Sequence, residues 1–124
     1  MRYKNGLYYV RIDDRRAEYP VVQVFSVAVV GVPGTPELYE KLNEMNTLLN
    51  CSKTFWVKDE ILFESAIPGD ALSLEGFESA CDDVGGAANY FCTRLASDFG
   101  GLTTFVDEQG PDYKPPGPGS RGYL

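Results

Sequence analysis

The segment from Val21 to Val30 constrains the fold of this chain more than any other feature. Its sequence, VVQVFSVAVV, is rich in β-branched residues, which favour strands. Apolar side chains occupy both faces of that strand. Alternation places Val21, Phe25, Val27 and Val29 on one face and Val22, Val24, Ala28 and Val30 on the other. A strand of this kind is usually central in a sheet and covered on both sides, and we expect the same here.

Three further strands are predicted around this segment. A strand over Leu7–Ile12 precedes it, separated by the polar connection 13–20. Thr54–Val57 and Glu60–Ile67 form a tight hairpin around a two-residue turn. We expect Leu7–Ile12 and one strand of that hairpin to be the outer strands of the sheet, because each is short and has a turn at one end.

Two helices complete the pattern. Thr35 as N-cap and Pro36 at the first helical position begin a helix that runs to about Asn50. Ser73 caps a longer helix, in which apolar residues recur every three to four positions as far as Phe99. The sequence therefore predicts an α+β fold in the order β-β-α-β-β-α. Two helices flank an antiparallel sheet of four to five strands.

Two adjacent glycines interrupt the long helix. Gly85-Gly86 costs about 1 kcal/mol per residue relative to alanine, so the pair needs a structural reason. Close approach of a neighbouring element is our main interpretation, with a kink or a functional hinge as the alternatives.

Length and composition indicate one globular domain with a tail. The chain has 124 residues, of which 44% are hydrophobic. We expect residues 1–106 to form a single α+β domain. Residues 107–124 are rich in Pro and Gly, cannot form a core and are expected to be disordered.

Charge and cysteine spacing limit the partners and the compartment. The net charge of −7 argues against nucleic acid, whose binding depends on clustered Lys and Arg. No apolar run is long enough to span a bilayer, and the N-terminus lacks a signal-peptide pattern. Cys81 and Cys92 lie too far apart on one predicted helix to form a disulfide. We therefore expect no membrane partner and a soluble, cytoplasmic protein with reduced thiols.

The sequence offers no recognisable catalytic site. It contains no histidine, no cysteine pair at metal-ligand spacing and no Gly-rich phosphate loop. We therefore predict a protein that is not an enzyme and has no cofactor or metal. Its densest carboxylates are interpreted as a solvated helix face: Glu75, Glu78, Asp82 and Asp83. A small carboxylate-dependent enzyme, with a metal ion on Glu78 and Asp82, stays open as an alternative.

Binding is the function that the pattern favours. Two helices are too few to cover both faces of a sheet whose central strand is apolar on each. Apolar patches that stay uncovered usually mark interfaces. An extended client would add to a sheet edge while its side chains fill apolar pockets. For peptide binding we predict Tyr9, Phe25, Trp56 and Phe63, with Leu38, Leu42 and Met45 at a homodimer contact. Trp56 and Phe63 could equally belong to the core, and a structural subunit of a larger complex is a further alternative.

Several motifs occur in a recognisable order. Thr35-Pro36-Glu37-Leu38 opens the first helix, LNEMN follows at 42–46, Phe55-Trp56 lies in an aromatic strand, an apolar strand spans Ile61–Ala66 and the last helix closes on Phe99-Gly100-Gly101. Over about residues 7–101 the chain resembles the YbjN / type III secretion chaperone-like family. A bacterial source, and more narrowly an actinobacterial one, is the expectation that accompanies this resemblance.

The resemblance implies a fold and a way of working. Members have an antiparallel sheet with flanking helices, and the secretion chaperones are generally homodimers that hold unfolded segments of partner proteins. No catalytic residues are implied. Members usually begin with a helix before the first strand, whereas this chain opens almost directly on the strand. Either that helix belongs to a longer parent protein, or the sheet face it would cover is left to a dimer partner.

Overall fold

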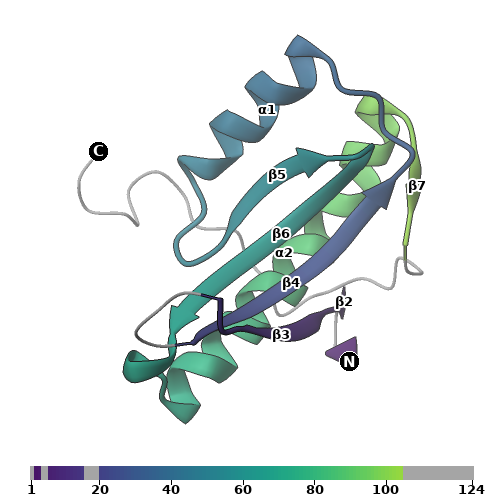
Figure 1. The fold of residues 1–124 in the computed structure, drawn as a ribbon. Helices are drawn as coiled ribbons and strands as arrows, with labels where there is room; N and C mark the ends of the chain where they lie inside the picture. The colour runs from purple at the N-terminus through teal and green to yellow at the C-terminus, as the bar shows by residue number, and fades with distance from the viewer. Residues whose placement is uncertain (1, 4–5, 16–19, 105–124) are drawn as a thin grey trace.

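The computed structural model describes residues 2–3, 6–15 and 20–104. Its elements follow the predicted α+β order, preceded by a short ribbon and followed by a short strand (Figure 1). The strands are β1 (Arg2–Tyr3), β2 (Gly6–Leu7), β3 (Tyr9–Asp13), β4 (Val21–Val30), β5 (Lys53–Val57), β6 (Glu60–Pro68) and β7 (Leu102–Thr103). The helices are α1 (Pro36–Asn46), a 3-10 turn at Gly69–Ala71 and α2 (Leu74–Phe99). The predicted tail, residues 107–124, lies outside the described residues.

The strand Val21–Val30 is central, as predicted. The sheet has the order β3-β4-β6-β5, and β7 also pairs with β4 at Val29 and Val30. All of these pairings are antiparallel. The outer strands β3 and β5 are those that the sequence predicted.

Both helices contribute to one core on one face of the sheet. α2 packs on β4 and β6 and crosses behind them in Figure 1, while α1 lies beside β5. Buried side chains from α1, including Leu38, join those of α2, including Val84, in a single apolar cluster. Along β4 the residues Val22, Val24, Ser26 and Ala28 are buried on this face, whereas Val21, Gln23, Phe25 and Val27 are only half-buried. Neither described helix covers the second face of β4, which agrees with the expectation that two helices are few for a strand apolar on both faces.

A β-bulge corrects one further detail of that strand. The pairing of β4 with β6 shifts between Val27 and Val29, so Ala28 is an extra residue in the ladder. The shift carries Val29 into the buried cluster, where it is fully buried. Strict alternation had placed Val29 with Phe25, and it fails because the bulge changes the phase of the strand.

Local chemistry sets the ends of the helices. Thr35 Oγ1 accepts a hydrogen bond from the Leu38 N–H at 3.1 Å, and Ser73 Oγ accepts one from the Gly76 N–H at 3.0 Å. α1 ends at Asn46, four residues before the predicted end at Asn50. The difference arises because Leu49 continues in a turn, with its N–H bonded to the Met45 carbonyl at 3.1 Å.

The β5–β6 turn and the glycine pair of α2 also agree with the sequence. Lys58 and Asp59 have φ values of 50° and 65°, and a two-residue turn of the I′ type requires positive φ at both positions. Gly85 and Gly86 are buried, and α2 continues through them without interruption. The unbroken helix argues against a kink, and the burial of both glycines fits the close approach of a neighbouring element.

Candidate functional site

The helix-free face of the sheet carries two rows of neighbouring side chains. The cross-strand register aligns Val27, Leu62 and Phe55 in one row. It aligns Tyr9, Phe25, Glu64 and Lys53 in the adjacent row. We call the apolar members of these rows the open face: Tyr9, Phe25, Val27, Phe55 and Leu62. No described helix packs on it.

Charged side chains flank the aromatic part of the open face. The rings of Tyr9 and Phe25 lie 5.6 Å apart, and the Arg11 guanidinium carbon lies 5.3 Å from the centre of the Phe25 ring. Arg11 Nε also donates to Gln23 Oε1 at 2.7 Å. On the other side, Lys53 Nζ lies 3.8 Å from Glu64 Oε1. The surface is therefore apolar along its middle and polar at its margins, which suits an extended chain of mixed composition.

Trp56 and Phe63 lie on the opposite, helix-covered face. Phe63 is fully buried, and its ring stacks on that of Phe91 with centroids 6.0 Å apart. Trp56 is half-buried, donates from Nε1 to the Val32 carbonyl at 2.7 Å and packs against Tyr39. The structure thus brings Tyr9 and Phe25 together but separates them from the other two predicted residues. Phe63 could have belonged to a binding surface or to the core, and its position is in the core.

The predicted dimer residues also point inward. Leu38, Leu42 and Met45 are at most 4% exposed and belong to the central apolar cluster. In this conformation they therefore do not present a surface to a second copy. The exposed aromatic residue of α1 is Tyr39, one position after Leu38 and on another side of the helix.

One residue that no sequence pattern predicted covers an edge of the sheet. Asn46, at the end of α1, donates from Nδ2 to the Thr54 carbonyl at 3.0 Å and accepts at Oδ1 from the Thr54 N–H at 2.7 Å. A side-chain amide has the same donor and acceptor groups as a neighbouring strand, so Asn46 closes the outer side of β5 at Thr54. The only hint in the sequence was the position of Asn46 in LNEMN.

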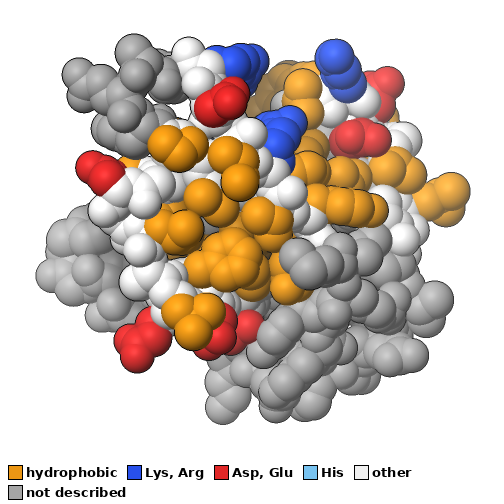
Figure 2. Space-filling model, turned by 60° about the horizontal axis from the view of Figure 1, so that its bottom comes forward, with side chains coloured by type: hydrophobic (Ala, Val, Ile, Leu, Met, Phe, Trp, Pro, Cys, Tyr) orange, Lys and Arg blue, Asp and Glu red, His pale blue; other side chains and the backbone are white. Residues whose placement is uncertain are grey.

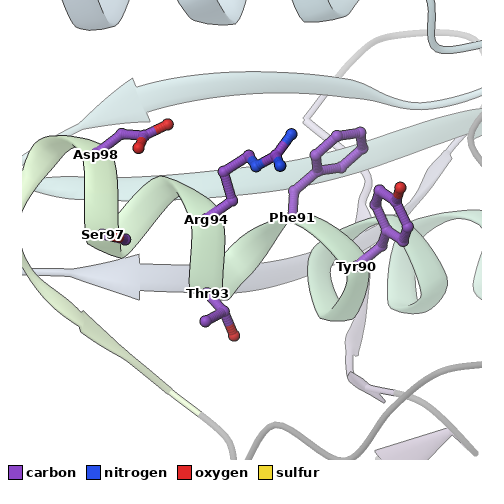
Figure 3. A pocket seen from close by; sticks show the side chains of 6 residues that line it. All are labelled: Tyr90, Phe91, Thr93, Arg94, Ser97 and Asp98. Atoms are coloured by element: carbon purple, nitrogen blue, oxygen red, sulfur yellow. The ribbon is translucent and has the colours of Figure 1, made fainter.

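Two hollows lie along α2. One, of about 280 Å³, lies between β3 and the first turns of α2 and is lined by Tyr8, Phe77, Glu78, Cys81 and Asp82. The other, of about 430 Å³, lies over Tyr90, Phe91, Thr93, Arg94, Ser97 and Asp98. In Figure 3 the Arg94 side chain extends toward Phe91 in this second hollow. Viewed from the side of β3, hydrophobic side chains gather over a broad area with carboxylates near its margin (Figure 2).

Comparison with known proteins identifies the family of this fold. Residues 1–107 match the family TY-Chap1, described as T3SS (YopN, CesT) and YbjN peptide-binding chaperone 1. The chain belongs to TY-Chap1. The resemblance predicted from the sequence and the predicted chaperone-like α+β class are therefore confirmed. No curated protein matches the sequence closely enough to count as a relative.

The carboxylates of this TY-Chap1 chain do not converge. Glu75, Glu78 and Asp82 are exposed along α2, and within the described ranges no group of three or more His, Cys, Asp or Glu side chains could hold a metal ion. Burial raises the pKa of Asp83, while Ser52 partly opposes that shift. Burial likewise raises the pKa of the Cys81 thiol, with Tyr8 acting in the opposite direction. Hydrogen bonds from Arg15 lower the pKa of Asp13.

Two general properties remain. No disulfide joins Cys51, Cys81 and Cys92. None of the described helices of this TY-Chap1 chain is long and apolar enough to cross a membrane. As the family description states, TY-Chap1 is a family of peptide-binding chaperones, and the coarse expectation of a protein or peptide client agrees with it.

Proposed function

We propose that this protein is a non-catalytic chaperone that binds an extended or partly unfolded segment of a partner protein. The observation that carries the proposal is the open face, an apolar row across three strands with no described helix upon it. Such a row offers contact area to a chain that has no fold of its own. Of the peptide-binding residues predicted from the sequence, Tyr9 and Phe25 lie on it.

The polar residues at its margins help the open face to remain exposed to water when no client is bound. Arg11 covers one side of the Phe25 ring, and Tyr9, whose ring carries a polar hydroxyl, is 45% exposed. A bound segment would displace water from Phe25, Leu62 and Phe55. It would keep polar contacts with Arg11 and Lys53.

We also propose that the protein is a homodimer, that it is cytoplasmic and that residues 1–106 form the domain that binds the client. Support for the dimer comes from family membership and from apolar surface that two helices leave uncovered. Exposed residues, with Tyr39 among them, would form the contact in place of the buried Leu38, Leu42 and Met45. Thiols outside disulfides fit a reducing compartment. No observation on the described residues favours the carboxylate-dependent enzyme over binding.

Binding to reduced, carboxymethylated lactalbumin, a permanently unfolded chain, tests the proposal. Fluorescence anisotropy should show saturable binding by the wild type and at least about tenfold weaker binding by Phe25→Lys, a loss of about 1.4 kcal/mol. Leu72→Lys makes the same kind of change at an exposed position outside the open face and should bind like the wild type. No saturable binding by the wild type, or equal binding by the two variants, would contradict the proposed site.

Sedimentation velocity separates the dimer from the binding activity. At micromolar concentration we expect the mass of two chains. A monomer that still binds the unfolded probe would refute the homodimer alone. A pull-down from the native host that recovers one fixed stoichiometric complex, rather than varied clients, would instead favour a structural subunit.

A further inference from the structure

The two edges of the sheet are not equivalent. The two-residue β5–β6 turn makes Val57 and Glu60 a hydrogen-bonded pair, so the N–H and C=O groups of Thr54 point away from β6. Asn46 binds both of those groups, and Thr54 is 2% exposed. A strand added to β5 would have to displace Asn46 and α1. The β5 edge is therefore closed to an extended client.

The β3 edge has the opposite character. Hydrogen-bonded and non-hydrogen-bonded pairs alternate in the same way between β6 and β4 and between β4 and β3. The backbone groups of Tyr9, Arg11 and Asp13 therefore bond to β4. Those of Val10 and Ile12 point outward, away from β4. No described strand pairs with this outer side of β3. Ile12 is 67% exposed. The β3 edge can therefore accept a further strand.

An apolar hollow with an acidic rim lies beside the start of β3, at Tyr8. Its floor is formed by Tyr8, Phe77 and Cys81, and its rim by the carboxylates of Glu78 and Asp82. Val10 packs on the core from the same side of the sheet. In an added antiparallel strand, every second side chain would point to this side, over Phe77 and Cys81.

We propose that the client binds as an antiparallel strand on the outer edge of β3, with small apolar side chains over the Phe77–Cys81 hollow and a flanking Lys or Arg at Glu78 and Asp82. This inference rests on the proposed function and adds a second contact for the same client. A strand on β3 lies beside Tyr9 but does not reach Leu62 and Phe55, so another part of the client would cover those residues. Antiparallel addition continues the pattern of a sheet whose pairings are all antiparallel. The acidic rim selects basic over acidic flanks by ordinary charge complementarity.

Synthetic peptides test the orientation without altering the protein. The probe is a fluorescein-labelled peptide in which Val and Thr alternate between paired Lys residues. In antiparallel pairing, the peptide residues whose side chains lie over the hollow direct their N–H groups toward β3. N-methylation of every Val should therefore weaken binding by about tenfold or more, whereas N-methylation of every Thr should have little effect. Equal weakening by the two modifications, or weakening by Thr methylation alone, would overturn the proposal.

Protein variants test the edge and the rim. Ile12→Pro removes the outward N–H and should weaken binding several-fold more than Ile12→Thr, which retains it. Replacing the flanking Lys by Glu should weaken binding to the wild type severalfold. The double variant Glu78→Gln/Asp82→Asn should lose that preference, and Glu37→Gln/Glu40→Gln, with the same charge change on exposed residues of α1, should keep it.

The outcomes distinguish this inference from the proposed function. Thermal unfolding first establishes that Ile12→Pro is folded, and the peptide modifications serve if it is not. If the wild type binds neither the peptides nor unfolded lactalbumin, the proposed function fails. If it binds lactalbumin while Ile12→Pro and Ile12→Thr bind equally well, the β3 edge alone is refuted.

Discussion

The side-chain amide of Asn46 binds both backbone groups of Thr54, accepting from its N–H at 2.7 Å and donating to its carbonyl at 3.0 Å. The pair joins the last residue of α1 to the outer strand of the sheet. Thr54 also donates from Oγ1 to the Leu62 carbonyl at 2.9 Å, so the contact extends to β6. Asn46 therefore holds α1 in place and covers an edge that would otherwise attract other strands.

Replacing Asn46 by alanine should lower the free energy of unfolding by about 1–3 kcal/mol, because two backbone groups of a buried residue lose their partners. Urea denaturation measures the change. Asn43→Ala alters the same kind of residue on an exposed part of α1 and should stay within about 0.5 kcal/mol of the wild type. Equal stability of the two variants would show that the Asn46 contact does not stabilise the fold.

Phe63 and Phe25 should respond differently to truncation. Phe63 is fully buried against Phe91, so Phe63→Ala should cost about 3–5 kcal/mol. Phe25 is half-buried on the open face, so Phe25→Ala should cost clearly less and should weaken binding of the unfolded probe. Denaturation curves and anisotropy on both variants check the contrast. A larger stability loss for Phe25 would mean that the open face belongs to the core.

The fold was predictable because most of its signals are local. Thr35, Ser73 and the Lys58-Asp59 turn act within a few residues, and each is where the sequence predicted it. The candidate site depends on pairing between distant segments. The bulge at Ala28 exists only in the pairing of β4 with β6. The face of the sheet on which Phe63 lies follows from its pairing with Ser26. Neither can be read from one strand alone, so the predicted site mixed residues from both faces.

Deleting residues 107–124 should leave the melting temperature within about a degree of the wild type. The segment is rich in Pro and Gly and has no apolar periodicity, so it contributes little to a core. Differential scanning calorimetry of the two chains provides the measurement. A fall of several degrees would mean that the tail docks on the domain, as an added strand or as a client of its own.

Asp83 should make stability depend on pH in an unusual direction. Burial is the main cause that raises its pKa, its Oδ2 atom has no hydrogen-bond partner among the described residues, and Ser52 opposes the shift only in part. A folded-state pKa above the unfolded value means that the folded state binds more protons between the two values. The contribution of Asp83 is therefore unfavourable above its folded pKa, and the penalty disappears as the pH falls through that pKa toward the unfolded value.

Asp83→Asn removes the charge while keeping the shape of the side chain. The variant should be more stable than the wild type at pH 7, and the advantage should shrink as the pH approaches about 4, where the unfolded carboxyl becomes protonated. Urea denaturation across this range measures the difference. Asp82→Asn, at the exposed neighbouring position, should give a smaller difference at pH 7. An Asp83→Asn variant that is less stable than the wild type at pH 7 would show that the charged carboxylate has a stabilising partner in the folded protein.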